Sequence, residues 1–561
     1  MNRARWHLLP TAPEESFHRT DLPPLLIQIL HNRNLFTPSQ YEPFLAADER
    51  LSTDPFRLSG VSQAVLRIHR ALLSGERIAV YGDFDADGIT ATLVLTQGLA
   101  LLGASPIVYI PHRLDEGHGL HHGALAKLIG QGVSLAITVD CGIGDIEEVS
   151  RARENGLDIV ITDHHTLPQN LPPAAATINP KQDDPTLPSA QLAGVGVAYK
   201  LLQALLTGTG KEGELPGFLD LVALGTVADM VPLVEENRYL VKQGLRIINN
   251  PRRPGLAELI RLANLTPGSL DAEAIAWSLG PRLNAAGRMD HAMLSYDLLS
   301  SESLEQGREL AQRLEEQNRE RQVLTNDAWT RAREQVLASG ADAPLLWVEG
   351  EDYPLGLVGI VAGRLVEEFH RPAVVVGRGE EASRGSARSI PEFDIIAAFT
   401  ENAHLLSRFG GHPAAAGFTL PTPNLAPLFQ SLMDRANLEL SGCDLRPELL
   451  IDVELPLEEL DAPTFATIQR MAPFGQGNPT PNILSSRARV ADHRTMGNNG
   501  DHLRLKLQAG DIAWDAVGFN MGHLADTVTP DIDIVYYLGL DTWGGQEKIK
   551  LYVRDFRPST P

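Results

Sequence analysis

The stretch from residue 77 to residue 102 constrains the fold of this chain more than any other. It opens with Arg77–Tyr81, an apolar run typical of a buried strand, and it ends with residues 89–102, an Ala/Leu-rich segment typical of a helix. Three carboxylates fill alternate positions of the turn between them: Asp83, Asp85 and Asp87. In α/β sheets, ligands bind where a strand ends and a helix follows. We therefore expect a ligand site at this turn.

The spacing of these acids points to a cation. Like charges this close repel one another, so a cluster of carboxylates needs compensation. A divalent cation is the usual solution, and oxygen-rich clusters suit magnesium or manganese. The alternative is a solvated acidic turn, because Asp and Gly are also ordinary turn residues. Taken by itself, the motif leaves both interpretations open.

Strands and helices alternate around this turn, which predicts a doubly wound parallel sheet. The expected helices cover residues 61–74, 121–131 and 145–156, and the expected strands cover residues 106–111, 134–140 and 157–163. We assign this first α/β domain to residues 51–290.

Two further strands of this sheet also end in polar clusters. Asp140 follows one of them, and Asp163-His164-His165 follows the next; a further acid, Asp229, lies in an apolar segment. The carboxyl ends of parallel strands share one edge of a sheet, so the three strand-end clusters are expected to converge. Asp and His together suit two divalent ions about 4 Å apart. A lone His would more often be a hydrogen-bonded core residue, but a His pair directly after an Asp favours a ligand.

The remainder of the chain divides into four segments. Residues 1–50 are Pro-rich and read as an arm that packs on the first domain. Residues 291–340 are helical in pattern and predict a long connecting helix, with a sparse apolar stripe at Leu304, Leu310, Leu314 and Val323. Residues 341–447 predict a second α/β domain, so that two such domains flank a cleft. Residues 448–561 predict an all-β barrel of the OB type, which suits single-stranded nucleic acid.

Two segments of the second α/β domain have phosphate-binding composition. Residues 385–389 carry Arg and hydroxyl side chains on a segment read as short and flexible, and residues 408–418 are Gly-rich and open with a cation. Small residues let backbone N–H groups approach a phosphate, and Arg adds bidentate contacts. A tight, closely packed turn explains the Gly-rich segment equally well.

The barrel carries basic and aromatic residues that would suit a nucleic-acid strand. They are Arg487, Arg489, His493, Arg494, Arg504 and Lys506, with Trp514, Phe519 and Trp543. From spacing alone, a solvated barrel face with core aromatics is the favoured interpretation.

Composition narrows the class of protein. A chain of 561 residues is too long for one core, and a formal net charge of −23 argues against nonspecific coating of nucleic acid, although a local basic groove is compatible with it. The two cysteines, Cys141 and Cys443, do not support a disulfide framework. Neither a signal pattern nor an apolar run of membrane-spanning length is present. We expect a cytoplasmic protein that does not enter a membrane.

Several motifs in order resemble the DHH phosphoesterase superfamily, named for the sequence seen here as Asp163-His164-His165. Within it, the chain is similar to the bacterial single-strand-specific 5′-to-3′ DNA exonucleases. The motifs are residues 81–90, 139–142, 162–165, 225–232, 279–289 and 410–417, and the resemblance runs from about residue 50 to the end. It implies a DHH domain, a DHHA1-type domain and an OB-fold domain.

The resemblance also implies roles for individual residues. Two Mn²⁺ or Mg²⁺ ions would be held by Asp83, Asp85, Asp87, Asp140, His164 and Asp229, with Asp140 bridging and with Asp83 standing where other members carry a His. The catalytic set would be His165, Asp140, His164, Arg388 and His412. The strand and its 5′ end would be lined by Arg282, Asn284, Arg288, Ser386, Arg388, Gly410, Gly411 and His412.

The expected activity is degradation of single-stranded DNA to mononucleotides in repair and recombination. The family leads us to expect a monomer that works with a single-strand binding protein and a helicase. One alternative is a small-substrate DHH phosphodiesterase such as an oligoribonuclease, against which the barrel and residues 279–289 weigh. Another is a catalytically silent replication scaffold, against which the complete ligand set weighs.

Overall fold

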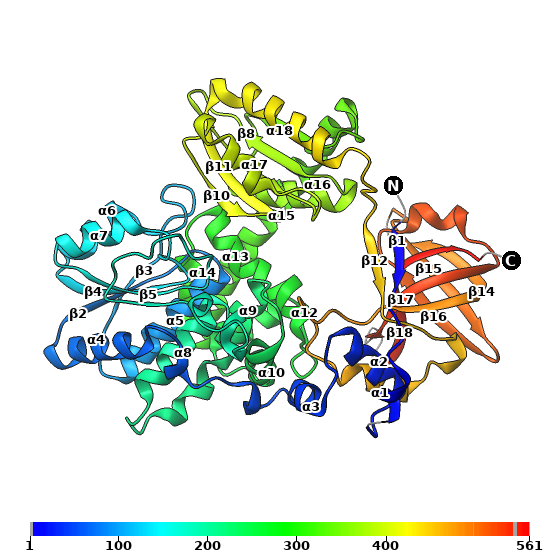
Figure 1. Cartoon of the computed structure of the whole chain (residues 1–561), viewed down its shortest axis with the longest axis horizontal. Helices are drawn as coiled ribbons and strands as arrows, with labels where there is room; N and C mark the ends of the chain where they lie inside the picture. Colours follow the sequence, from blue (N-terminus) through cyan, green and yellow to red (C-terminus); the bar gives the residue numbers. More distant parts are fainter. Residues whose placement is uncertain (1–3, 19, 498, 542–546, 560–561) are drawn as a thin grey trace. The chain divides into compact units, whose positions relative to one another are not determined.

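The structure is a computed structural model that describes residues 4–18, 20–497, 499–541 and 547–559 (Figure 1). The chain divides into two compact units, one comprising Leu51–Leu445 and the other comprising the N-terminal residues up to Arg50 with those from Arg446 onward. The prediction that the N-terminal arm packs on the first α/β domain is therefore wrong. No helix among the described residues is both long enough and apolar enough to cross a bilayer.

The first sheet confirms the predicted parallel arrangement. Its strand order is β3-β2-β4-β5-β6, and every neighbouring pair is parallel. The strands are β2 Arg77–Tyr81, β3 Ile107–Tyr109, β4 Val133–Val139, β5 Asp158–Thr162 and β6 Ala176–Ile178. Tyr81 is in register with Thr138, and Val139 with Thr162, so the carboxyl ends of β2, β4 and β5 form one edge.

Helices cover both faces of this sheet. Along β2, Ile78 and Val80 join the large helical core, whereas Ala79 and Tyr81 face the opposite core, as the period-two alternation of a strand requires. The large core contains α4 Val61–Ser74, α5 Ala86–Leu101, α8 Gly194–Leu206 and α9 Leu219–Ala228, and the smaller core contains α6 His122–Gly130 and α7 Ile146–Glu154. Helix α5 is buried along nearly its whole length, so the acidic turn opens the central helix.

A helical region extends this core toward the second sheet. It comprises α10 Glu235–Ile248, α11 Pro254–Leu262, α12 Ala272–Ala274, a π-helix at Ile275–Leu279, α13 Gly280–Met289, α14 Met293–Ser300 and α15 Leu304–Ser339. The prediction of a single helix over residues 291–340 is therefore wrong, because α14 ends at Ser300 and a new helix begins at Leu304. The hydroxyl of Ser303 accepts a hydrogen bond from Gln306 N and caps α15. Of the predicted stripe, Leu310 and Leu314 are buried, whereas Leu304 and Val323 are exposed.

The second sheet is mixed. Its order is β10-β11-β9-β8-β7, with only the β7–β8 pair parallel. Its strands are β7 Leu346–Gly350, β8 Ala373–Gly377, β9 Ala382–Arg388, β10 Arg408–His412 and β11 Ala415–Pro421, and its helices are α16 Val358–Phe369, α17 Ile395–Glu401 and α18 Leu425–Leu440. The predicted flexible segment at residues 385–389 lies mostly in β9, and the Gly-rich segment is the β10–β11 hairpin, so both are ordered sheet rather than loops.

The second unit contains a closed β-barrel. Strands follow the order β14-β15-β16-β18-β17, and β14 pairs with β17 to close the ring. They are β14 Ile483–Met496, β15 His502–Ala509, β16 Ile512–Gly518, β17 Asp531–Asp541 and β18 Lys548–Pro558, with β13 Val453–Glu454 beside β14 and α19 Ala462–Gln469 nearby. Trp543 lies outside the described residues.

The N-terminal arm is part of this barrel unit. Strand β1 (Arg5–Leu8) pairs in parallel with β12 (Glu448–Ile451), and Leu26, Ile29 and Leu30 of α2 (Pro24–Asn32) enter the barrel core. The remaining helices of the arm are α1 Glu14–His18 and α3 Pro38–Ala46. The apolar patches read as contacts to the first domain are thus contacts to the barrel.

Candidate active site

The acidic turn is organised by backbone hydrogen bonds. Asp85 caps α5, because its Oδ1 accepts from Asp87 N at 2.9 Å and from Gly88 N at 3.2 Å. Helix α5 begins at Ala86, three residues before the predicted start, so Asp87 lies in its first turn. The Asp87 carboxylate accepts from the first two N–H groups of α8, at 2.7 and 2.8 Å. The N-terminus of α8 therefore holds the Asp87 carboxylate in one orientation, and the N-terminus of α5 holds that of Asp85.

Asp140 directly follows β4 in a strained backbone conformation. Its φ is +60°, a left-handed value that is uncommon for a residue with a side chain and that clusters at functional sites. The first residue of α8, Gly194, lies so close that a Cβ there would be 2.6 Å from Asp140 Oδ1. Only glycine leaves room for this carboxylate.

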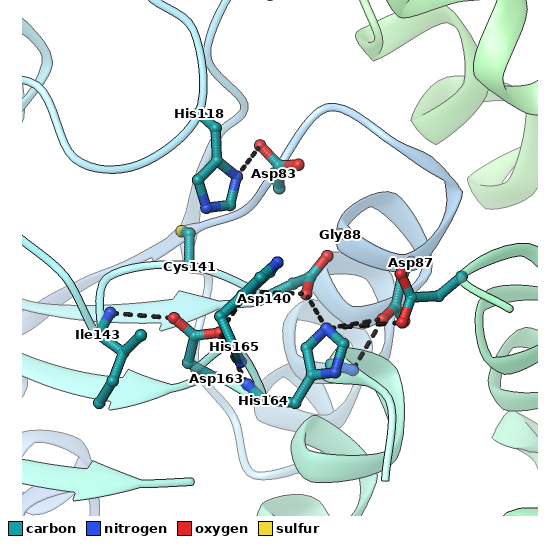
Figure 2. A network of polar contacts seen from close by, with 12 residues as sticks. Asp83, Asp87, Gly88, His118, Asp140, Cys141, Ile143, Asp163, His164 and His165 are labelled. Atoms are coloured by element: carbon teal, nitrogen blue, oxygen red, sulfur yellow. Dashed lines mark hydrogen bonds and ion pairs between the residues drawn. The ribbon is translucent and has the colours of Figure 1, made fainter. Parts of the chain in front are cut away.

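Asp163 holds the two histidines that follow it. Its Oδ1 accepts from the backbone N–H groups of His164 and His165 and lies 2.7 Å from His165 Nδ1, while its Oδ2 accepts from Ile143 N (Figure 2). Although burial opposes it, hydrogen bonding to His165 holds the pKa of Asp163 well below its ordinary value. Asp163 was not among the predicted site residues, although the name-giving motif contains it. It is a positioning residue for both imidazoles.

His164 stands at the centre of the acids (Figure 2). Its Nε2 lies 3.1 Å from Asp140 Oδ1, 3.6 Å from Asp229 Oδ2 and 3.9 Å from Asp87 Oδ2. Asp229 follows α9, so a helix end and strand ends supply the same site. Burial and the neighbouring His165 lower the pKa of His164 to about 3, which leaves its ring neutral and able to donate a lone pair.

The donor atoms form overlapping groups that suit metal ions. Atoms within 4.8 Å of one another come from three sets: Asp87, His164 and Asp229; Asp83, Asp85 and Asp140; and Asp140, His164 and His165. All six predicted ligands are thus brought together, and Asp140 is shared between sets. We call the five aspartates among them the acidic edge: Asp83, Asp85, Asp87, Asp140 and Asp229.

The state of these atoms supports a cation. Among the described residues, the buried Asp140 Oδ1 and His164 Nε2 have no partner with hydrogen-bond geometry. Burial and the charge of Asp85 raise the pKa of Asp87 to about 7, and burial with Asp87 raises that of Asp229 to about 9. Crowded carboxylates with an unsatisfied imidazole nitrogen are the donor set that Mn²⁺ or Mg²⁺ requires. The residues fit two such ions.

His118 belongs to the site but was not predicted from the sequence. Its Nδ1 lies 3.3 Å from Asp83 Oδ1; burial opposes protonation, but the Asp83 carboxylate raises the pKa of His118 to about 9. The loop before α6 is pinned by Tyr81 Oη donating to Gly119 O and by Leu120 N donating to Asp145. The run of histidines at residues 112, 118, 121 and 122 was the signal available in the sequence.

The second sheet brings His412 to the same place. The His412 ring is nearly parallel to that of His165, with centroids 6.4 Å apart and an interplanar angle of 7°. Arg408, on the same strand β10, donates to His118 O at 3.2 Å, and Arg384 of β9 donates to Leu114 O at 2.7 Å. The two α/β parts of this unit therefore meet at the metal-ligand edge, with Gly410 and Gly411 in the strand that carries His412.

Arginines gather beside the acids without carboxylate partners. We call Arg113, Arg288, Arg321 and Arg388 the arginine cluster. Arg388 donates to Ser386 Oγ at 3.0 Å and Arg288 to Gly356 O at 3.2 Å, and within the described part of the chain neither forms an ion pair. Burial, followed by the charges of Arg113, Arg321 and Arg388, lowers the pKa of Arg288 to about 9. Uncompensated guanidinium groups of this kind are suited to phosphate.

Two of the residues predicted to contact the DNA strand already have partners inside the protein. Arg282 pairs with Glu315 at 2.7 Å, and Asn284 Oδ1 accepts from Ala86 N at 2.7 Å, at the start of α5. Arg113, which was not predicted, lies 4.5 Å from the centre of the Phe84 ring, and the charges of Asp85 and Asp83 act on it. It connects the arginine cluster to the acidic edge.

Family models match three parts of the chain. Residues 77–226 match the N-terminal domain of the DHH family, residues 339–438 match the DHHA1 domain, and residues 451–555 match the RecJ OB domain. These matches fall on the segments for which domains were predicted, whose boundaries stay predictions.

Relatives and solved structures cover nearly the whole chain. The single-stranded-DNA-specific exonuclease RecJ of Bacillus subtilis is 38% identical over 96% of this chain and 68% of its own length, and that of Escherichia coli is 33% identical over 96% of each. The crystal structure of RecJ from Thermus thermophilus in complex with Mn²⁺ matches with a TM-score of 0.86 and 29% identity, over all of this chain and 80% of that one. A Mg²⁺ complex of the same protein matches with a TM-score of 0.80.

Proposed function

The chain belongs to the RecJ family of metal-dependent, single-stranded-DNA-specific exonucleases, and from that premise we propose that it removes mononucleotides from the 5′ end of a strand. The observation that carries this proposal is the convergence of Asp87, Asp140, His164 and Asp229 on one point at the sheet edge. A nuclease needs concentrated positive charge beside the phosphate that it attacks, and this donor set can bind the cations that supply it.

The ligand sets suggest how two ions would be held. Asp87, His164 and Asp229 would hold one ion, and Asp83 and Asp85 the other, with Asp140 shared between them. Bound there, the ions would lower the pKa of a water molecule and neutralise charge on the attacking and leaving oxygens. The hydrogen bond from His164 N to Asp163 holds His164 in place, while burial and the charge of His165 keep its ring neutral. The protein's contribution at the edge is thus a rigid, preorganised donor set.

His165 and His412 are suited to the phosphoryl group itself. Hydrogen bonding of Nδ1 to Asp163 raises the pKa of His165 against the effect of burial, which favours the cationic ring. The His165 and His412 rings are nearly parallel with their centroids 6.4 Å apart, so the two sheets bring two imidazoles together at the metal-ligand edge. We infer that both imidazoles donate to non-bridging oxygens as negative charge develops.

Strand binding would depend on the arginine cluster and its neighbours. Arg388 with Ser386, and Arg288 with Arg113, offer donors without carboxylate partners next to the acidic edge. They would bind the terminal phosphates, which gives 5′-to-3′ polarity if the 5′ end is the one held. Arg282 and Asn284 would support this contact through the elements they tie together. The barrel would hold the strand by backbone charge and base stacking.

The working context follows from the family. We propose that the protein acts in the cytoplasm, as a monomer, in DNA repair and recombination, with a single-strand binding protein and a helicase that supply the strand. The exonuclease relatives support single-stranded DNA as substrate. The protein partners and the monomeric state rest on the family resemblance alone.

A strand labelled at either end tests the proposal. With Mn²⁺ or Mg²⁺, a 5′ label should be released first as a mononucleotide, a 3′ label should remain on shortening fragments, and duplex should resist. Comparing strands with and without a 5′-phosphate measures the contribution of the terminal phosphate. Early release of the 3′ label would overturn the polarity, and activity confined to dinucleotides would favour the small-substrate alternative.

A further inference from the structure

A large aromatic side chain is exposed to solvent on the helical segment that leads into α13. Trp277 is 78% exposed, whereas Ile275 and Leu279 at the ends of the same π-helix are buried. A π-turn inside a helix shifts the residues around it and recurs at functional sites. Here it lies between α12 and α13 and leaves the indole on the outside. The exposed indole offers a flat apolar face on which another ring can stack.

The position of Trp277 is tied to the metal-ligand edge through α9. One helical turn after Trp277, Gly280 packs so closely on α9 that a Cβ there would lie 3.2 Å from Ala228 Cβ. Ala228 directly precedes Asp229, and the next residue, Met230, is 70% exposed with a φ of +62°. Two large apolar side chains are therefore exposed, Met230 directly after Asp229 and Trp277 on the helical segment that packs against the end of α9.

Guanidinium groups lead from the arginine cluster toward this tryptophan. Arg282 follows Trp277 by five residues on the same helical segment, about 7.5 Å along its axis. Burial and then the charges of Arg364 and Arg282 lower the pKa of Arg321, and Arg321 in turn acts on Arg288. Arg288, Arg321 and Arg282 are thus close enough for neighbouring charges to interact electrostatically. Arg282 itself is paired with Glu315, so a DNA strand along this segment would have its phosphates on the arginine cluster and a base beside Trp277.

We propose that Trp277 is a base-stacking platform for the single strand on its way to the acidic edge, with Met230 as an apolar contact nearer the ligands. This deepens the proposed function and rests on it. An indole stacks on any base, so the contact would add affinity without sequence preference. It would also position the strand, because a base held here sets which phosphate reaches the acidic edge.

The barrel's aromatics differ from Trp277 in this respect. Tyr537 and Tyr552 stack on each other at 5.1 Å, Phe519 lies parallel to Tyr552 at 6.2 Å, and Arg554 covers Tyr537 at 4.5 Å. Because Tyr537 faces Tyr552 in the β17–β18 register, these rings form a cross-strand contact that stabilises the sheet. Their faces are largely used within the protein, whereas no ring or cation contact to Trp277 is found in the described part of the chain.

The test measures strand binding separately from cleavage, in an Asp140→Asn background. Trp277→Ala should weaken binding of a 20-nucleotide strand by about 5- to 150-fold, the range for one base–aromatic stack, and Trp277→Phe should restore most of it. The matched control is Leu73→Ala, which removes a 90%-exposed apolar side chain from α4. The same variants in the active enzyme should raise KM more than they lower kcat.

A double-mutant cycle with abasic nucleotides identifies the contact. One abasic position should weaken binding to Trp277 protein by the same factor as Trp277→Ala and should add nothing to that variant. The inference is overturned if no position shows this dependence, or if Trp277→Ala equals the Leu73→Ala control. If binding shows the dependence but the active enzyme cleaves no strand, the proposed nuclease function fails while the stacking contact stands.

Discussion

The acidic edge and the arginine cluster are both groups of like charge that are buried or half-buried, but the chain holds them in different ways. Asp85 and Asp87 accept backbone N–H bonds at helix N-termini, and Asp140 is confined by Gly194. Arg288 and Arg388 come from separate elements, and each donates to nearby oxygens through one end of its guanidinium. The acids are fixed by main chain, whereas the arginines keep donors available.

This difference matches what each group has to bind. A small hard cation demands donors at short, fixed distances, so its ligands gain from rigid backbone support. A strand that moves through the site presents a new phosphate after every cleavage, so its contacts gain from long side chains that readjust. Substitutions on the acidic edge should therefore abolish chemistry, and substitutions in the arginine cluster should weaken binding gradually.

The largest effect is expected at Asp140. Asp140→Asn removes the charge shared between the ligand sets, so turnover should fall by more than about 10³-fold, above the loss from one electrostatic donor. Strand affinity in the absence of metal should change little. Single-turnover kinetics and fluorescence anisotropy measure the two quantities, with Asp352→Asn as the control because that carboxylate is 88% exposed. Wild-type turnover in Asp140→Asn would refute the assignment of the acidic edge.

A smaller loss of activity is expected on substitution of Asp163, which hydrogen-bonds to His164 and His165 but is not itself a predicted metal ligand. Asp163→Asn weakens the hydrogen bonds to the His165 ring and to His164 N. Loss of such an orienting partner lowers activity by about 10- to 100-fold. The kcat should carry most of this loss, since Asp163 does not reach the strand. A loss equal to that of Asp140→Asn would mean that Asp163 is itself a ligand, and no loss would reduce it to a turn residue.

The acidic edge could be predicted from the sequence, and much of its surroundings could not. Strand ends in a parallel sheet converge by topology, so Asp83, Asp140 and His164 could be placed together from periodicity alone. Asp229 ends a helix, and only the family motif identified it as a ligand. His118 sits in a loop, where neither strand nor helix periodicity says which way a side chain points. The arm's association with the barrel depends on long-range pairing of β1 with β12, for which local pattern carries no signal.

The arginine cluster should show graded behaviour. Arg288→Leu should remove one phosphate contact, weakening strand binding several-fold and reducing the salt slope of log K by about 0.7. Because Arg288 has no ion-pair partner in the described part of the chain, the melting temperature of the free protein should stay the same or rise. Arg378→Leu is the control, at a half-exposed arginine that pairs with Glu349. An unchanged salt slope would show that Arg288 does not contact a phosphate of the bound DNA strand.

The smallest effect is a pH dependence of metal stabilisation. In the metal-free protein the pKa of Asp87 is raised to about 7 and that of Asp229 to about 9, above the ordinary value near 3.9. The folded state then binds more protons than the unfolded state between about pH 4 and pH 9, so its stability falls as pH rises, by at most about 1.4 kcal/mol per pH unit for each group. A cation removes this cost by favouring the ionised forms.

The gain in melting temperature on adding Mn²⁺ should therefore be larger at pH 8 than at pH 6, where protons still compete for the carboxylates. Thermal unfolding with EDTA or with excess Mn²⁺ at both pH values measures it. Replacing Asp87 and Asp229 together by Asn should remove most of the difference between the two pH values, whereas Asp352→Asn should preserve it. If Mn²⁺ raised the melting temperature of the unmodified protein equally at both pH values, the ion would bind away from Asp87 and Asp229. The acidic edge would then not differ from the arginine cluster as a rigid cation site.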